Sequence, residues 1–178
     1  ALAHLERAVT RGLLPQPDLA PIFERLGARL AGVGDDPDAR RAFGGAIAAG
    51  GPTASRLHDF ALAWARSGDP AGAERLWREA LRLDPGFRPA RESLGGALAM
   101  QGRFGEAVVE LRRAAAQAPG DAETRLLLAR ALAAAGDLAG ARGELEGARA
   151  LAPGLPGIAE LAVELDRAPS AAADPAAP

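Results

Sequence analysis

Apolar and small residues recur along this chain with a period of 34 positions. Pro85, Pro119 and Pro153 stand 34 residues apart, and counting back from each proline gives the same order of positions. Because three successive stretches keep identical offsets, we interpret the chain as an array of repeated structural units. The three sets are Leu57, Phe60, Ala61, Trp64, Ala73, Trp77 and Ala80; Arg91, Leu94, Gly95, Leu98, Ala107, Leu111 and Ala114; and Arg125, Leu128, Ala129, Leu132, Ala141, Leu145 and Ala148.

A weaker copy of the pattern lies one period upstream. Gly51 occupies the position of the closing proline there, and Pro52 follows it. We interpret this stretch as a degenerate first unit. Its positions are Phe23, Leu26, Gly27, Leu30, Ala39, Phe43 and Ala46. The predicted units are therefore 20–53, 54–87, 88–121 and 122–155.

The spacing within a unit predicts two helices that pack against each other. Leu57, Phe60, Ala61 and Trp64 follow an i, i+3, i+4, i+7 pattern, which places them on one face of a helix. Alanines at the matching positions of both helices allow the helix axes to approach closely. The fold class is all-α, and few residues favour strands.

Glycine and aspartate separate the two predicted helices of a unit. The pair occurs at Gly34-Asp35, Gly68-Asp69 and Gly136-Asp137. Glycine readily takes the left-handed conformation that ends a helix, and aspartate accepts backbone N–H groups at the start of the next one. The closing proline then ends the second helix, because proline cannot continue it.

These motifs resemble those of the tetratricopeptide repeat (TPR) family, over roughly residues 20–155. The resemblance implies a right-handed α-solenoid of antiparallel helix pairs, with the first helix of each pair on the concave side. It also implies binding of peptides or protein partners on that side. The subgroup that grips acidic chaperone tails uses lysine and asparagine side chains, and this chain has neither residue. We therefore do not expect that function here.

Both ends of the chain differ from the repeats. Residues 1–19 are expected to hold the last helix of a further, truncated unit, marked by Leu5 and Ala8, followed by a connector at Pro15 and Pro17. Residues 156–167 are expected to form a capping helix, with Glu160 and Glu164 on its solvent side. The Ala/Pro-rich residues 168–178 are expected to be a disordered tail at a natural C-terminus.

Composition narrows the possible functions. The formal net charge is −2 with both signs spread along the chain, which argues against nucleic-acid binding. All 21 basic residues are arginine, a bias that indicates a GC-rich bacterial genome. Without cysteine there are no disulfides or thiolate metal sites. No signal peptide or membrane-spanning run is visible, and the sequence leaves cytoplasmic, periplasmic and extracellular locations open.

The sequence offers no convincing catalytic, cofactor or metal site. Ser55, His58 and Asp59 are close in sequence, but Ser55 and His58 share one helix and no oxyanion-binding device is near. The second histidine, His4, is too distant in sequence to complete a metal site with His58. The acidic stretch 35–38 lacks the length and later glutamate of an EF-hand loop. We therefore expect no enzyme activity and no cofactor.

The candidate binding residues lie on the first helix of each pair and point away from their own partner helix. They combine mixed charge with an apolar strip, which favours a helix or an extended peptide with a few apolar anchors. The predicted groove residues are Glu24, Arg25, His58, Asp59, Leu62, Arg66, Glu92, Ser93, Met100, Glu123, Leu126, Leu127 and Arg130.

Three functions remain open at this point. The leading hypothesis is a scaffold or adaptor that binds a protein or peptide partner in the concave groove. The second is the C-terminal repeat region of a larger enzyme whose catalytic domain lies elsewhere. The third is a structural subunit of a large assembly, including a membrane-bound or extracellular one.

Overall fold

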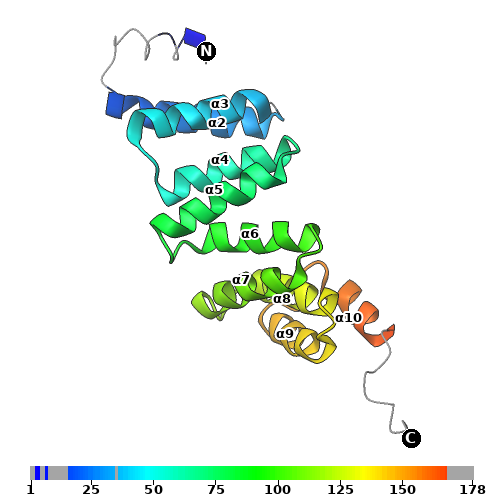
Figure 1. Ribbon diagram of the computed structural model, residues 1–178. Coiled ribbons are helices and arrows are strands. Elements are labelled where there is room, and N and C mark those ends of the chain that lie inside the picture. Colours follow the sequence, from blue (N-terminus) through cyan, green and yellow to red (C-terminus); the bar gives the residue numbers. More distant parts are fainter. Residues whose placement is uncertain (1–2, 5–6, 8–15, 35, 168–178) are drawn as a thin grey trace, which may run out of the picture. The chain divides into compact units, whose positions relative to one another are not determined.

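The fold is entirely helical in the part of the chain that the structure describes. The structure is a computed structural model, and it describes residues 3–4, 7, 16–34 and 36–167. Nine helices and no strand occur within 16–34 and 36–167 (Figure 1). They are α2 (Gln16–Gly32), α3 (Asp36–Gly50), α4 (Ala54–Arg66), α5 (Pro70–Leu83), α6 (Arg88–Met100), α7 (Phe104–Gln117), α8 (Ala122–Ala134), α9 (Leu138–Leu151) and α10 (Ile158–Arg167). The all-α prediction is confirmed.

The chain forms two compact units, 1–94 and 95–178, which divide within α6. In the first unit α2 pairs with α3, and α4 pairs with α5 and packs on α3. In the second unit α8 packs on α7 and α9, and α10 packs on α9 and α8. The expected truncated helix and the expected tail at 168–178 lie mostly or wholly outside the described residues. Helix α2 begins at Gln16, inside the stretch expected to be a connector.

Aromatic rings fill the space between the helices of the first unit. Phe23 on α2 packs with Ala42 and Ala46 on α3, and Phe43 on α3 packs with Ala63 on α4. These residues match the apolar positions of the repeat pattern, apart from Ala42 and Ala63, and all five are buried. The small alanine side chains let the rings reach the neighbouring helix, so one large residue serves two helices.

Leucines play the corresponding part in the second unit. Leu128 and Leu132 on α8 and Leu145 on α9 are each at most 3% exposed. Leu161 and Leu165 on α10 are equally buried. Helix α10 therefore covers part of the apolar surface of α8 and α9.

The turns between paired helices have the predicted conformation. Gly68 and Gly136 have φ angles of 83° and 87°, in the left-handed region. The next residues, Asp69 and Asp137, accept hydrogen bonds from the backbone N–H groups of Gly72 and Gly140. Both parts of the glycine–aspartate prediction are confirmed at these two turns.

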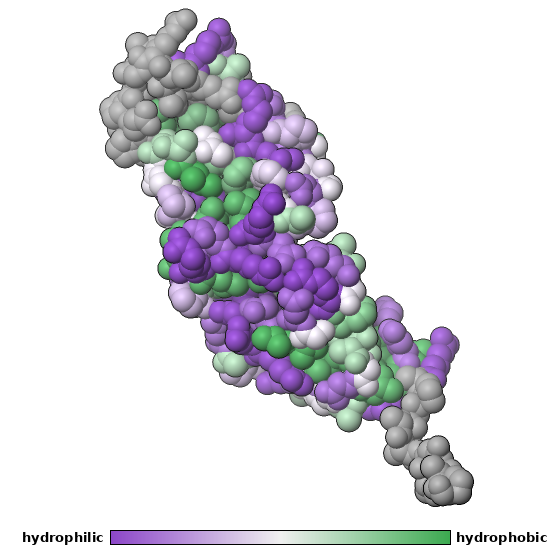
Figure 2. Space-filling view, viewed as in Figure 1, coloured by the Kyte–Doolittle hydropathy of each residue, from purple (hydrophilic) through white to green (hydrophobic). Residues whose placement is uncertain are grey.

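Charged and apolar residues are interspersed on the face of the protein that Figure 2 shows. Figure 2 shows hydrophilic residues spread widely, with smaller hydrophobic areas between them. Val33 and Met100 are the most exposed large apolar residues in the described part of the chain, at 80% and 92%. Among the described residues, no helix combines the length and the apolar character needed to cross a membrane.

Candidate partner-binding groove

The predicted groove residues all lie on the first helices of the pairs. Each helix α2, α4, α6 and α8 contributes between two and four of them. Glu24 and Arg25 are on α2; His58, Asp59, Leu62 and Arg66 on α4; Glu92, Ser93 and Met100 on α6; and Glu123, Leu126, Leu127 and Arg130 on α8.

Two of the predicted charged residues on α2 and α4 form ion pairs with another helix of the first unit. The Arg56 Nε atom lies 2.5 Å from a Glu24 carboxylate oxygen, which links α4 to α2. The Arg66 Nε atom lies 2.9 Å from Asp36 Oδ1 at the start of α3. A partner would have to compete with these pairs, so Glu24 and Arg66 are less available than their positions alone suggest. Arg25, in contrast, is exposed.

His58 and Asp59 form a half-buried polar group on α4. The His58 ring makes an edge-to-face contact with Phe87, with centroids 5.7 Å apart, and its buried Nδ1 atom has no hydrogen-bond partner among the described residues. Burial lowers the pKa of His58, because the charged imidazolium loses hydration. Burial raises the pKa of Asp59, and the negative charge of Glu24 raises it further.

The predicted residues on α6 have different surroundings. Glu92 accepts a hydrogen bond from Arg88 one turn earlier, at 2.6 Å. Ser93 is half-buried, and Met100 is 92% exposed at the end of the helix. Glu92 is therefore partly satisfied within α6, whereas the Met100 side chain is almost fully in water.

The predicted residues on α8 surround a shallow pocket of about 340 Å³. Glu123, Leu126, Leu127 and Arg130 line it, and the turn before α10 supplies Leu155 and Pro156. Leu126 is 6% exposed and forms the floor, whereas Leu127 is 38% exposed at the rim. A second pocket of about 370 Å³ lies between α8 and α10 and also contains Arg130.

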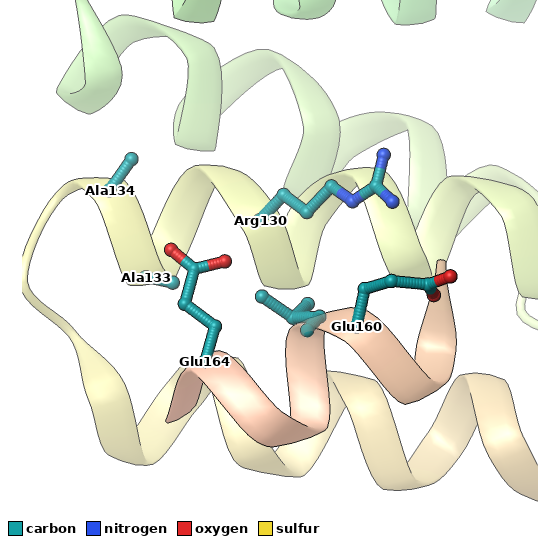
Figure 3. Close-up of a pocket in the computed structure, with 6 residues that line it drawn as sticks. Arg130, Ala133, Ala134, Glu160 and Glu164 are labelled. Atoms are coloured by element: carbon teal, nitrogen blue, oxygen red, sulfur yellow. The ribbon is translucent and has the colours of Figure 1, made fainter. Parts of the chain in front are cut away.

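The second pocket brings in residues that the sequence analysis did not place in the groove. Ala133 and Ala134 come from α8, and Glu160, Leu161 and Glu164 come from α10 (Figure 3). The sequence assigned both glutamates to the solvent side of the capping helix, which is compatible with their exposure. A clue was available, because α10 follows α9 directly in sequence and packs on α8 as well as on α9.

Among the described residues, no cluster of three or more histidine and carboxylate side chains is close enough together to hold a metal ion. Ser55 is exposed, and no hydrogen bond joins it to His58 among the described residues. What the arrangement offers is an apolar pocket with charged groups at its edges, which suits recognition of another polypeptide.

Comparison with known proteins identifies the repeat. The family model described as tetratricopeptide repeat matches residues 98–165. A comparison with curated protein sequences gives no match. Three solved structures share the fold at low sequence identity. MamA (residue 41 to the end) from Desulfovibrio magneticus RS-1 is 22% identical, with a TM-score of 0.75 over 84% of this chain and 86% of that chain.

The other two structures cover the chain similarly. YrrB, described as a TPR protein with an unusual peptide-binding site, is 20% identical, with a TM-score of 0.73 over 94% of this chain and 82% of that chain. PilF of Pseudomonas aeruginosa is 20% identical, with a TM-score of 0.76 over 84% of this chain and 68% of that chain. These likenesses concern the fold.

Proposed function

Because this chain is a tetratricopeptide repeat protein, we propose that it is a non-catalytic scaffold or adaptor that binds a segment of a partner protein. The contact surface is the side of the first helices on which the predicted groove residues lie. The observation that carries the proposal is the pocket beside α8, where an apolar floor adjoins an exposed arginine.

The size and lining of this pocket suit a polypeptide side chain. A volume of about 340 Å³ is at the small end of the range for sites that hold a whole small molecule. The pocket offers apolar contact to a bound side chain. Binding of an aliphatic or aromatic anchor would remove water from the anchor and from the pocket wall, which is favourable for apolar surfaces. The apolar lining residues are Leu126, Leu127, Leu155 and Pro156. Anchors of this kind, inserted into a pocket, usually dominate the binding energy of protein interfaces.

The peptide-binding site named for YrrB is consistent with this proposal, since that protein has the same fold. The alternative of a C-terminal region of a larger enzyme has no specific support among the described residues. The alternative of a subunit in a larger assembly has no stronger support. Val33 and Met100 are 80% and 92% exposed, but they lie in different compact units, and single exposed apolar residues are ordinary on protein surfaces.

The test is selection of peptides from a random library displayed on phage, with the purified chain as bait. We expect a motif with a recurrent aliphatic or aromatic position, and micromolar binding of the corresponding synthetic peptide. Leu127→Glu should weaken that binding more than about tenfold, because it places an uncompensated charge at the rim of the pocket.

Leu151→Glu is the matched control. Leu151 is an exposed leucine of the same compact unit, at 47%, and it does not line the pocket. We expect this variant to bind the selected peptide as the original chain does. Equal losses in the two variants, or the absence of any selected motif, would contradict the proposed groove. Sedimentation of the chain as a defined oligomer would instead favour the assembly alternative.

A further inference from the structure

We propose that the two pockets beside α8 select a partner segment that carries a basic side chain next to an aliphatic one. This inference rests on the proposed function and adds the chemistry of the segment. The aliphatic side chain enters the pocket lined by Leu126, Leu127, Leu155 and Pro156. The basic side chain, lysine or arginine, enters the neighbouring pocket between α8 and α10.

The geometry makes the two pockets parts of one surface. Arg130 lines both of them, so the two pockets are neighbours that share this side chain. Figure 3 shows Glu160 and Glu164 on the α10 side of the second pocket, with Arg130, Ala133 and Ala134 on the α8 side. Glu160 and Glu164 are one helical turn apart and therefore lie on the same side of α10. Figure 3 shows their carboxylates turned to opposite sides, that of Glu164 toward Ala133 and that of Glu160 away from it, so a cation in this pocket would be attracted by both and would contact one of them.

The charge around the two pockets is unbalanced toward negative. Glu123, Glu160 and Glu164 contribute three carboxylates, and Arg130 contributes the one cation among the lining residues of these pockets. All four side chains are exposed, and within residues 95–167 none of them forms an ion pair with another residue. This surface therefore favours binding of a partner segment with positive charge.

Other charges of the same unit contrast with these four. Arg103 pairs with Glu106, Arg113 with Glu110 and Arg149 with Glu146, each over three residues of one helix. Arg125 on α8 pairs with Glu144 on α9 at 2.9 Å. Pairing within the unit is thus common away from the pockets. Because Glu160 and Glu164 have no ion pair within residues 95–167, their carboxylates are available to pair with a basic side chain of another protein.

The position of Arg130 explains why it does not neutralise the two glutamates. Its guanidinium group lies against Gly157, which has a φ of 92°, and a Cβ atom at position 157 would collide with Nη2. The glycine therefore leaves room for the guanidinium beside the turn before α10. From there its N–H groups can donate to backbone carbonyl oxygens of a bound segment, while Glu160 and Glu164 remain available for a basic side chain.

An acidic segment is disfavoured by the same arrangement. It would place its carboxylates near three like charges and gain the attraction of Arg130 alone. A segment without charge would use the apolar pocket and leave both α10 glutamates unused. The basic and aliphatic pair is the chemistry that uses all the lining groups.

The experiment compares peptide selections on three forms of the full chain. The first is the original chain and the second is Glu160→Gln/Glu164→Gln. The third is Glu146→Gln/Asp166→Asn. This control variant also removes two negative charges, but from exposed positions of the same unit that line neither pocket. The probe is a random peptide library on phage. The best peptide from the original chain is then synthesised, together with a version in which its basic residue is glutamine.

We expect the original chain and the control variant to select lysine or arginine beside an aliphatic residue. The Glu160→Gln/Glu164→Gln variant should keep the aliphatic preference and lose the basic one. Its affinity for the synthetic peptide should fall roughly three- to tenfold, as expected for one or two exposed ion pairs. The glutamine version of the peptide should bind the original chain and this variant equally.

The outcomes separate this inference from the proposed function. Selection of aliphatic peptides without a basic residue, or with acidic residues, would overturn the inference and leave the groove proposal standing. The absence of any motif in all three selections would overturn both. Self-association that buries α10, measured by sedimentation of the original chain and of the double glutamine variant, would assign the surface to a second copy and also overturn the inference.

Discussion

At the scale of single residues, close contact between helices requires glycine at particular positions. A Cβ atom at position 95 would lie 2.6 Å from Cγ of Leu111, which is 1% exposed and cannot move aside. A Cβ atom at position 96 would meet nothing within 4 Å. A side chain at position 95 would therefore not fit, whereas one at the adjacent position 96 would be accommodated without a clash.

We therefore predict opposite effects of the same substitution at these two positions. Gly95→Ala should destabilise the protein by about 1–3 kcal/mol, because it overpacks a filled interface. Gly96→Ala should stabilise it by up to about 1 kcal/mol, because alanine favours the helix over the unfolded chain. Urea unfolding followed by circular dichroism measures both. Similar effects in the two variants would show that helix propensity, and not space, determines the cost at Gly95.

Asp59 is a second residue with an unusual environment, because its surroundings disfavour the ionised carboxylate. Burial and the nearby Glu24 carboxylate both raise its pKa above the ordinary value of 3.8, so ionisation of Asp59 reduces stability at neutral pH. The folded protein holds this proton more tightly than the unfolded chain does. The stability penalty is therefore complete above the raised pKa and disappears as the pH falls toward 3.8.

Asp59→Asn should therefore stabilise the protein at pH 7, and the gain should vanish as the pH falls toward 3.8. Both tryptophans, Trp64 and Trp77, lie in the same compact unit as Asp59, so tryptophan fluorescence during urea unfolding reports on this change. Acid also protonates His58, but this affects both proteins equally and cancels in the difference. A gain that is constant with pH would mean that the carboxylate charge is not its source.

At the scale of helices, the turns within the pairs show how local sequence sets the start of an element. Asp69 and Asp137 each cap a helix, whereas Arg103 at the equivalent place before α7 makes no such hydrogen bond from its side chain. Arg103 instead pairs with Glu106 in the first turn of α7. The repeat thus tolerates loss of the cap where another polar contact stabilises the first turn.

Asp69→Ala should destabilise the protein by about 1 kcal/mol, because the N–H group of Gly72 loses its acceptor. Asp69→Asn keeps an oxygen at the same place and should change stability by less than about half as much. Tryptophan fluorescence again provides the measurement, since Trp77 lies on α5 itself. If the two variants were equally destabilised, the charge of Asp69 and not its hydrogen bond would be responsible.

The helices and their turns could be predicted from the sequence because the relevant signals are local and repeated. The apolar spacing of Leu128 and Leu132 gives the buried side of α8 directly, and glycine before aspartate gives the turns. The ion pairs of Glu24 with Arg56 and of Arg66 with Asp36 could not be predicted in this way. They join residues about one repeat apart, and spacing alone does not define which long side chains meet.

The candidate site was only partly predictable for the same reason. Periodicity indicated that Leu126 and Leu127 face away from the core of their own pair, but burial differs sharply between them, at 6% and 38%. Both leucines line a pocket with Leu155 and Pro156, which follow an entire helix later, so the spacing within α8 could not give their exposure. The pocket of Glu160 and Glu164 likewise requires the packing of α10 on α8, which no pattern within α10 reveals.

At the scale of the whole molecule, the charge distribution bears on how a partner is recognised. The formal net charge is only −2, with acidic and basic residues spread along the chain. A charged partner would therefore experience little long-range attraction from the molecule as a whole. Any dependence of binding on salt must come from local groups such as Glu160 and Glu164, within about one Debye length of the bound segment.

We therefore predict that salt weakens binding of the selected basic peptide to a limited extent, and that replacing Glu160 and Glu164 abolishes this effect. Raising the salt concentration from about 50 to about 500 mM should weaken its binding to the original chain by roughly two- to fivefold, because exposed ion pairs are screened. The same change should leave binding to the Glu160→Gln/Glu164→Gln variant almost constant. Isothermal titration calorimetry at several salt concentrations gives both slopes. Equal slopes would place the source of attraction elsewhere on the molecule, whereas a slope that vanishes with the two glutamates would locate it on α10.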